Sequence, residues 1–327
     1  MPNLLKNKRV LVTGGAGFIG SNLIESLLAA GNHVVCLDNF STGKRENLLG
    51  FLHNPEFKLI EGDIRDIETC LKAVKDIEIV FHEAALGSVP RSIKDPVTST
   101  DVNIGGFVKI LFASKESGVR RFIYAASSST YGDHPDLPKI EDKIGKPLSP
   151  YAITKYADEL FASNFALNYG IEVIGLRYFN VFGKRQDPEG AYAAVIPKFI
   201  KMLMNHEIPV INGDGTISRD FTYVENVIQV NHLAACISDS SAINHLYNVA
   251  HGERTSLNEL FYILRGNIGG YDEAVNNIEP LYGPDRKGDI THSLASIDKA
   301  KRLLGYDPEF NVREGLERTV RWFMNES

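Results

Sequence analysis

A glycine-rich turn near the N-terminus constrains the fold of this chain more than any other feature of its sequence. The apolar run Val10–Thr13 leads into GGAGFIG (residues 14–20), and a helical pattern, Ser21–Ala30, follows. Glycines permit a tight turn and a close backbone approach to a pyrophosphate, and the free N–H groups of a helix N-terminus attract anions. This order predicts a dinucleotide-binding βαβ unit, and the alternative is a helix-entry turn that binds nothing.

The remainder of the first half alternates strand-like and helix-like segments. The strand-like runs are short, apolar and β-branched: Val10–Thr13, His33–Asp38, Lys58–Glu61, Ile77–His82, Arg121–Ala126 and Glu172–Arg177. Helical patterns lie between most of them: Ser21–Ala30, Ile67–Val74, Ile104–Ser117 and Ile153–Asn168. This alternation predicts an α/β fold of the Rossmann type, in which helices cover both faces of a doubly wound parallel sheet.

The alternation breaks after about Asn180, where turn-rich segments begin. A length of 327 residues corresponds to about two domains. We expect a dinucleotide-binding domain over residues 1–180, rejoined by part of residues 220–250, where His245–Ala250 is strand-like. A smaller, interleaved C-terminal α/β domain is expected over residues 181–327.

Composition excludes several classes of protein and partner. Lys and Arg total 35 against 41 Asp and Glu, a formal charge of −6, which argues against broad binding of nucleic acids or anionic membranes. No apolar run approaches the roughly 20 residues that span a bilayer, and no secretory signal is apparent. The three cysteines form no CxxC pair, which favours a reduced, cytoplasmic compartment. The scattered histidines give no metal-binding motif.

Two aspartates after later strands support the dinucleotide interpretation. Asp38 ends the second strand, 18 residues after Gly20, where a carboxylate can bind ribose hydroxyls and would repel a 2′-phosphate. This favours NAD over NADP, although Lys44 and Arg45 lie near enough to reach a phosphate. Asp63 follows the third strand and can bind the adenine amino group, cap the next helix, or do both.

Candidate catalytic residues lie in the middle of the chain. Tyr151 and Lys155 are four positions apart at the start of a helical pattern, and so share a helix face. An ammonium group beside a phenol favours the phenolate, which is a usable general base. Upstream, Ser127–Tyr131 follows the carboxyl end of a strand, where ligands bind in parallel sheets. A hydroxyl of Ser127 can share a substrate proton there, whereas Ser128 and Ser129 are equally typical of a turn.

These motifs together resemble the extended short-chain dehydrogenase/reductase superfamily, over nearly the whole chain. Within it the sequence looks like the nucleotide-sugar 4-epimerases, and most like the UDP-N-acetylglucosamine 4-epimerase branch of bacterial polysaccharide pathways, which also includes enzymes acting on UDP-N-acetylglucosaminuronic acid. The segments that carry the resemblance are GGAGFIG, LDNFSTG, GDI, HEAALGSVPRS, ASSSTYGDHPDLPK, SPYAITKY, LRYFNVFG, INGDGTISRDFTYVENV and RKGDITHS.

The resemblance implies roles for matching positions. It implies that Tyr151 is the catalytic base, that Ser127 shares the proton, and that Lys155 tunes Tyr151 and binds the nicotinamide ribose. The implied NAD-binding residues are Gly14, Gly17, Phe18, Ile19, Gly20, Asp38, Asn39, Ser41, Thr42, Asp63, Ile64, Ala84, Ala85, Leu86, Tyr151, Lys155 and Tyr178. The implied UDP-sugar-binding residues are Ser88, Ser127, Ser128, Asn180, Ala194, Val195, Ile211, Asn212, Arg219, Arg286, Asp289 and Ser293. Arginines suit the diphosphate, because a guanidinium binds phosphate oxygens bidentately.

The residues also discriminate between related reactions. Enzymes of the superfamily that eliminate water carry an acidic pair beside the catalytic hydroxyl, but here no carboxylate occurs between Ser127 and Asp133. This favours a 4-epimerase over a nucleotide-sugar 4,6-dehydratase, and the presence of Tyr151 and Lys155 disfavours a non-catalytic NAD-binding regulator. Ser293 stands where galactose-specific relatives have a tyrosine, which predicts room for a 2-acetamido group unless Ser293 is simply a loop residue.

Two further expectations follow from the resemblance. Ser88 and Arg91 are expected to approach the sugar, and Arg91 would favour a carboxylate at C6. The superfamily dimerises through the helix that carries the Tyr-x-x-x-Lys pair and its neighbour, so a homodimer through Ile153–Asn168 and Ile104–Ser117 is expected. The apolar faces of these two helices are equally compatible with packing against the sheet.

Overall fold

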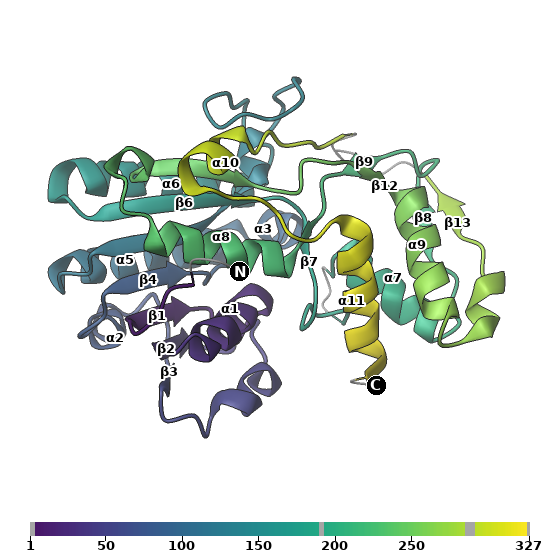
Figure 1. Ribbon diagram of the computed structural model, residues 1–327. Helices are drawn as coiled ribbons and strands as arrows, with labels where there is room; N and C mark the ends of the chain where they lie inside the picture. The colour runs from purple at the N-terminus through teal and green to yellow at the C-terminus, as the bar shows by residue number, and fades with distance from the viewer. Residues whose placement is uncertain (1–3, 190–192, 285–291, 326–327) are drawn as a thin grey trace.

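The centre of the computed structural model, which describes residues 4–189, 193–284 and 292–325, is a parallel sheet of seven strands (Figure 1). In spatial order these are β11 (His245–Val249), β6 (Glu172–Tyr178), β5 (Arg121–Ser127), β4 (Ile79–His82), β1 (Arg9–Thr13), β2 (His33–Asp38) and β3 (Phe57–Glu61). The strand order reverses direction between β1 and β4, as in a doubly wound sheet. The Rossmann-type fold expected from the sequence is confirmed.

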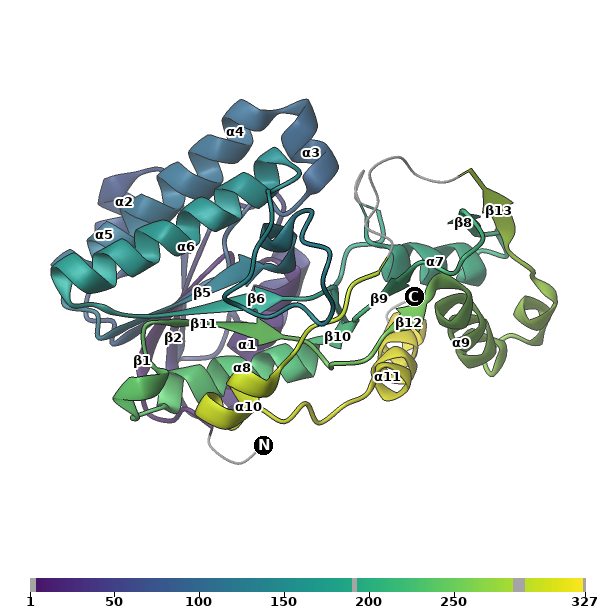
Figure 2. The ribbon, with the colours of Figure 1, turned by 90° about the horizontal axis from the view of Figure 1, so that it is seen from above.

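Helices cover both faces of the sheet (Figure 2). One face carries α2 (Ile67–Ala73), α5 (Phe107–Glu116) and α6 (Pro150–Tyr169), and the other carries α1 (Phe18–Ala29), α8 (Val224–Cys236) and α10 (Asp298–Leu304). Each face has its own buried apolar cluster, one containing Phe107 and Phe122 and the other Ile24 and Val227. Because both faces are covered, the strands are near-continuous apolar runs in the sequence.

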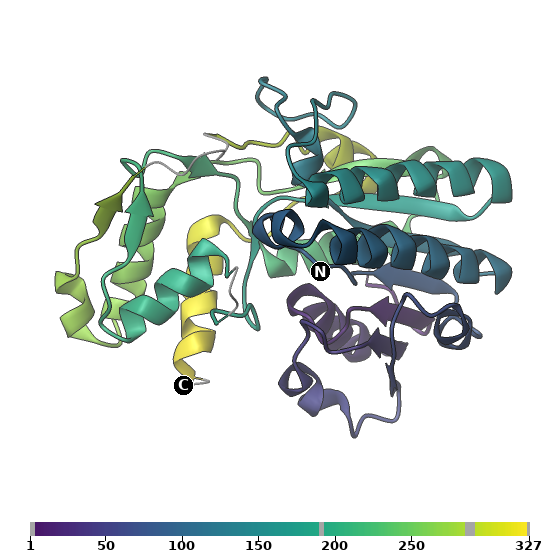
Figure 3. The same ribbon diagram turned by 180° about the vertical axis from the view of Figure 1, so that it is seen from behind.

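Short helical segments connect the strands on the α6 side. Helices α3 (Val89–Lys94) and α4 (Pro96–Thr100) are followed by a π-helical stretch, Asp101–Gly106, that leads directly into α5. Short 3-10 helices lie at Arg45–Phe51, Ser128–Tyr131, Ser240–Ala242 and Glu273–Asn277. Figure 3 shows α5 and α6, in blue and teal, side by side on this face.

A second, smaller unit lies beside the sheet (Figures 1 and 2). Its helices are α7 (Val195–Met204), α9 (Leu257–Gly269) and α11 (Val312–Asn325). Its short strands pair as β7 (Val181–Phe182) with β10 (Thr222–Tyr223), β8 (Val210–Asn212) with β13 (Leu281–Gly283), and β9 (Ser218–Arg219) with β12 (Thr255–Ser256). The helices bury a third apolar cluster that includes Phe199, Phe261 and Leu316.

The chain crosses between the two units more often than the sequence indicated. Strand β11 returns to the main sheet, and so does the segment 295–306, which packs in the same apolar cluster as α1 and α8. Backbone hydrogen bonds hold this segment: the N–H of Lys139 donates to Leu294 O, and the N–H of Ser296 donates to Lys139 O. The return of β11 lies within the expected rejoining segment, residues 220–250, whereas the return of residues 295–306 was not expected.

Helix α6 begins earlier than its apolar pattern predicts. Pro150 occupies its first turn, and the side chain of Ser149 accepts a hydrogen bond from the N–H of Ala152 at 3.1 Å. Both features are typical of a helix start. The helix therefore includes Tyr151 as well as Lys155, and the two side chains lie on its first turns.

A buried ion pair fastens α6 to the sheet. The guanidinium of Arg177, on β6, binds both carboxylate oxygens of Glu159, on α6, at 2.8 Å each. It also donates to Glu141 O at 2.9 Å and lies 4.8 Å from the ring centroid of Tyr131. The side chains of Arg177 and Glu159 are only 2% and 3% exposed. Removal of either partner would leave a buried charge uncompensated.

We therefore expect Glu159→Ala to lower the free energy of unfolding by about 3–5 kcal/mol. The matched control is Glu116→Ala, because Glu116 pairs with Lys115 on an exposed surface and such pairs contribute about 0–1 kcal/mol. Urea denaturation followed by circular dichroism measures both. Equal, small losses in the two variants would contradict the importance of the buried pair.

Candidate active site

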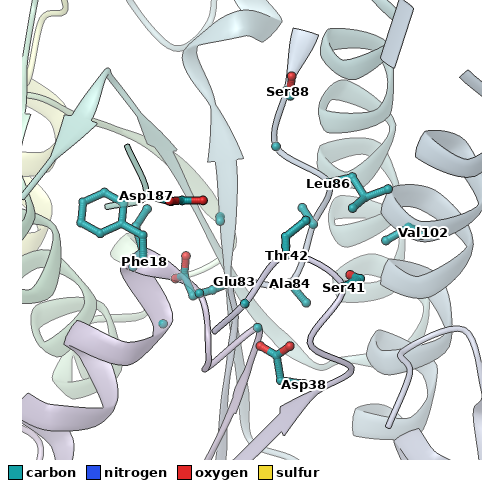
Figure 4. Close-up of a pocket in the computed structure, with 18 of the residues that line it drawn as sticks. Phe18, Asp38, Ser41, Thr42, Glu83, Ala84, Leu86, Ser88, Val102 and Asp187 are labelled. Carbon is teal, nitrogen blue, oxygen red and sulfur yellow. The ribbon is translucent and has the colours of Figure 1, made fainter. Parts of the chain in front are cut away.

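A cavity of about 640 Å³ opens at the carboxyl ends of the parallel strands. Figure 4 shows Phe18 and Glu83 on one side of it and Ser41 and Leu86 on the other. Every residue to which the sequence assigned cofactor binding lines this cavity: Gly14, Gly17, Phe18, Ile19, Gly20, Asp38, Asn39, Ser41, Thr42, Asp63, Ile64, Ala84, Ala85, Leu86, Tyr151, Lys155 and Tyr178. Residues far apart in the sequence are brought together because all the strands run in one direction.

Two glycines of the turn, Gly14 and Gly20, have no space for a side chain. A Cβ on Gly14, whose φ is +68°, would lie 2.7 Å from the backbone of Ala84, and a Cβ on Gly20 would lie 2.3 Å from Gly14 O. Helix α1 starts after Gly17 with no side-chain cap and no acidic residue in its first turn. Its N-terminus therefore faces the cavity with the electrostatic character that a pyrophosphate requires.

Asp38 lies where a ribose-binding carboxylate is expected. Its oxygens accept hydrogen bonds from the N–H groups of Ala16, at 2.9 Å, and Phe40, at 2.8 Å. Burial raises the pKa of Asp38, while these two N–H groups favour the ionised form. The carboxylate is thus held in a fixed orientation at the end of β2, with the cavity beside it.

Asp63 lines the cavity, but it does not cap the following helix. The N-cap of α2 is Asp66, which accepts hydrogen bonds from Glu68 and Thr69, so the capping alternative for Asp63 is wrong. Arg65 and Asn39 instead donate to the Asp63 carboxylate at 2.8 Å, and the hydrogen bond from Arg65 lowers its pKa to about 2. Asp63 is therefore a charged hydrogen-bond acceptor at the adenine end of the expected site.

The three candidate catalytic residues meet at the wall of the cavity. Tyr151 is anchored through its backbone, whose N–H donates to Ser92 Oγ at 3.0 Å. Lys155 Nζ donates to Ala125 O, on β5, at 2.9 Å and to Asp158 Oδ2 at 3.3 Å. The Ser127 hydroxyl ends β5 and accepts hydrogen bonds from the N–H and the hydroxyl of Ser129.

Ser128 and Ser129 have different positions in the following 3-10 helix. Ser128 lines the cavity, whereas Ser129 serves the turn by donating to Ser127 Oγ at 2.8 Å. The turn interpretation therefore applies to Ser129. No acidic side chain lies within Ser127–Tyr131, so this segment contributes no carboxylate to the cavity.

The charges around Lys155 keep it protonated. Burial on its own would lower the pKa of Lys155, but the nearby Asp158, Tyr151 and Glu83 favour the ammonium form, and the net shift is upward. A fixed positive charge therefore lies beside Tyr151.

Glu83 is a site residue that the sequence reasoning missed. It lines the cavity immediately after β4, and burial raises its pKa to about 7. Its Oε1 accepts a hydrogen bond at 2.9 Å from the hydroxyl of Tyr178, which in turn accepts one from Asn231. The sequence feature that could have identified Glu83 is an acidic residue directly after a strand-like apolar run.

Asn103 is a second residue that was missed, and it positions the cavity wall from behind. Its side chain accepts a hydrogen bond from the N–H of Leu86 at 2.8 Å and donates to Thr154 Oγ1 at 3.0 Å. It thereby joins the loop after β4 to α6, from inside the π-helical stretch. A polar residue between apolar helix positions was the only indication in the sequence.

The expected sugar-nucleotide residues fall into three groups. Ser88, Ser127, Ser128, Asn180 and Ala194 line the cavity, as does Arg91. Val195, Ile211, Asn212, Arg219 and Ser293 lie in the second unit or beside it and are not part of the cavity lining. Arg286 and Asp289 lie outside the described residues.

Comparison with known proteins identifies the family. A model of the NAD dependent epimerase/dehydratase family matches residues 10–250. The chain belongs to this family. The structure is similar to a UDP-N-acetylglucosamine 4-epimerase from Methanobrevibacter ruminantium in complex with UDP-N-acetylmuramic acid (40% identity, TM-score 0.92, 99% of this chain and 100% of that one).

Two other solved structures are also similar. One is a UDP-glucose 4-epimerase from Thermotoga maritima with UDP-glucose (38% identity, TM-score 0.89, 97% of this chain and 99% of that one). The other is a dTDP-glucose 4,6-dehydratase from Streptomyces venezuelae with NAD bound (30% identity, TM-score 0.87, 97% of both chains). The family thus includes both epimerases and dehydratases, and the fold alone does not separate them.

The cofactor of this epimerase/dehydratase chain is NAD. The structure fits it, because the glycine turn with no space for a Cβ at Gly14 and Gly20, the uncapped α1 N-terminus and the Asp38 carboxylate border one cavity. Over residues 4–189, 193–284 and 292–325 no cluster of His, Cys, Asp and Glu suits a metal ion. In the same part of the chain no helix has the length and apolarity needed to cross a membrane.

We expect Gly20→Ala to weaken NAD binding about tenfold or more, because the added Cβ would overlap Gly14 O and force the turn open. NAD content after gel filtration and titration with fresh NAD measure the effect. The control is Gly266→Ala in α9, where a Cβ meets nothing within 4 Å. Unchanged NAD affinity in Gly20→Ala would contradict the assignment of the turn.

Proposed function

We propose that this protein is a UDP-N-acetylhexosamine 4-epimerase, which interconverts UDP-GlcNAc and UDP-GalNAc, the corresponding uronic acids, or both. The observation that carries the proposal is that Tyr151, Lys155 and Ser127 border the same cavity as the nucleotide-binding turn, while the segment Ser127–Tyr131 contributes no carboxylate. The similarity to UDP-sugar 4-epimerases over nearly the whole chain supports a UDP-sugar substrate.

The proposed chemistry assigns a role to each side chain. Tyr151 takes the proton from the C4 hydroxyl of the sugar, and the Ser127 hydroxyl shares that proton. Lys155 favours the ionised form of Tyr151, because the Ala125 carbonyl holds the lysine ammonium beside the phenol. NAD, when bound, supplies a hydride acceptor that can return the hydride to either face of C4.

Inversion requires a firm hold on the nucleotide and a loose hold on the sugar. We assign NAD binding to the unit built on the seven-stranded sheet, and UDP binding to the second unit through Arg219, Arg286 and Asp289. The sugar end of the cavity is lined by small side chains, Ser88, Ser128 and Ala194, which leave space for the sugar to present its other face. The side-chain amide of Asn180 donates a hydrogen bond to Asp220 O at 2.9 Å, where the chain passes from one unit to the other.

A homodimer is part of the proposal. The outward face of α6 carries exposed apolar side chains, including Leu160 at 55% and Leu167 at 83%, and Phe112 on α5 is 42% exposed. Apolar side chains of neighbouring helices that do not pack against the sheet are typical of an interface between copies.

The direct test incubates the purified protein with UDP-GlcNAc and, separately, with UDP-GlcNAcA, without added NAD. We expect conversion to the galacto isomer by retained NAD, with the relative rates identifying the preferred sugar. Tyr151→Phe is expected to lose at least about 100-fold in turnover while keeping its NAD, because it lacks the proton acceptor. Chromatography of the products and the NAD content measure both results.

Other outcomes of this test have distinct meanings. A product that has lost water would assign the chain to the dehydratases. An active Tyr151→Phe variant would overturn the role of Tyr151. Absence of conversion with NAD bound and UDP-sugar supplied would overturn the epimerase proposal.

Ser293 offers a test of the proposed preference for an N-acetylated sugar. It is half-buried, and its N–H donates to Ser218 O beside Arg219 at 3.2 Å. We expect Ser293→Tyr to lower kcat/KM for UDP-GlcNAc by roughly tenfold or more, because a ring would occupy the space of the acetamido group. UDP-glucose, which lacks that group, is the control substrate. Equal effects on both substrates would contradict the steric role.

A further inference from the structure

Asp158 is a buried carboxylate that faces the candidate catalytic lysine. It lies one turn after Lys155 on the side of α6 that packs on the sheet, and the two side chains are only 1% and 3% exposed. Its Oδ2 accepts a hydrogen bond from Lys155 Nζ at 3.3 Å, while Oδ1 is buried without a hydrogen-bond partner among the described residues. Burial raises the pKa of Asp158 to about 7, while the charge of Lys155 and its hydrogen bond favour the ionised form.

The two other acids nearby have hydrogen-bond partners other than Lys155. Both oxygens of the adjacent Glu159 are bound by Arg177, and Glu83, at the end of β4, accepts its hydrogen bond from Tyr178. Asp158, in contrast, makes its ion pair with Lys155. Lys155 thus lies near three acidic groups, Asp158, Tyr151 and Glu83, and Asp158 is the one that forms an ion pair with it.

The remaining titratable groups around the pair are neutral. His82, on β4, hydrogen-bonds Thr13 Oγ1 at 2.8 Å, and burial lowers its pKa to about 3. Tyr124, on β5, is fully buried, and burial raises its pKa well above the ordinary value. Neither group carries a charge near neutral pH, so they cannot replace Asp158 as the counter-charge of Lys155.

We propose that Asp158 is a positioning residue that orients the Lys155 ammonium and offsets its charge, and thereby sets the pH at which Tyr151 accepts a proton. This inference rests on the proposed role of Tyr151 as the base. An ammonium ion stabilises a phenolate through its positive charge, and a carboxylate 3.3 Å from that ammonium opposes the effect. With Asp158 neutral, Lys155 still has the Ala125 carbonyl to hold it, but its charge acts more strongly on Tyr151.

Three substitutions separate charge from packing. Asp158→Asn and Asp158→Ser remove the charge and keep a hydrogen-bond acceptor, whereas Asp158→Glu keeps the charge. Glu116→Gln, on the exposed surface of α5, is the matched control for loss of one negative charge. Thermal unfolding of each variant establishes that it is folded.

Two measurements give the pH at which Tyr151 ionises. One is the midpoint of the acidic limb of kcat/KM against pH. The other is the ultraviolet tyrosinate titration of each variant minus that of the same variant carrying Tyr151→Phe, which needs no turnover. We expect both midpoints to fall by about 1 pH unit in Asp158→Asn and Asp158→Ser, and to stay at the wild-type value in Asp158→Glu and Glu116→Gln.

The outcomes are distinguishable from failure of the proposed function. A shifted tyrosinate titration in a protein that does not turn over UDP-sugars would support the role of Asp158 and overturn the epimerase proposal alone. Folded neutral variants with an unchanged or higher midpoint would overturn the inference. If both neutral variants failed to fold while Asp158→Glu folded, Asp158 would be a structural requirement of α6, and the inference would also be overturned.

Discussion

The parallel direction of seven strands is the constraint on which the rest of this structure depends. The register places Thr13 beside Leu37 and His82, and Ser127 beside Tyr178, so these strands end at the same edge of the sheet. The glycine turn, Asp38 and Glu83 therefore emerge together, and hydrogen bonds join them: the N–H of Ala16 donates to Asp38, and the N–H of Glu83 donates to Thr13 O. A cavity at this edge is a consequence of the topology, and the loops decide what it can bind.

Helix α6 is the exception, because no strand end positions it. Its inner face carries Lys155, Asp158 and Glu159, and each of these charges is met by a partner: Asp158 for Lys155, and Arg177 for Glu159. Its outer face carries exposed apolar residues. Of these two pairs, the Glu159–Arg177 pair joins the helix to the sheet, because Lys155 and Asp158 both lie on α6. The hydrogen bond from Lys155 to Ala125 O and the apolar contacts of Ala162 and Phe165 add to this attachment and hold Tyr151 and Lys155 at a defined place.

The two units are joined by buried polar contacts as well. Asp220, between β9 and β10, accepts hydrogen bonds from the N–H groups of His251, Gly252 and Ala295, while burial raises its pKa to about 7. These donors come from two passages of the chain between the units, one after β11 and one before α10. One carboxylate therefore holds the crossing segments together, close to Arg219 and to the turn at Asn180.

The sequence by itself determined the Rossmann-type sheet and the placement of the glycine turn and Asp38 at its edge, because glycine spacing, strand runs and the position of Asp38 are local patterns with local physical causes. Only the tertiary structure decided the rest. The return of residues 295–306 to the first core, the partners of Glu83 and the counter-charge of Lys155 depend on contacts between segments distant in sequence. From the sequence alone, an acidic residue such as Asp158 in a helix is expected to be solvent-exposed. Only the packing of the folded chain shows that it is buried against Lys155.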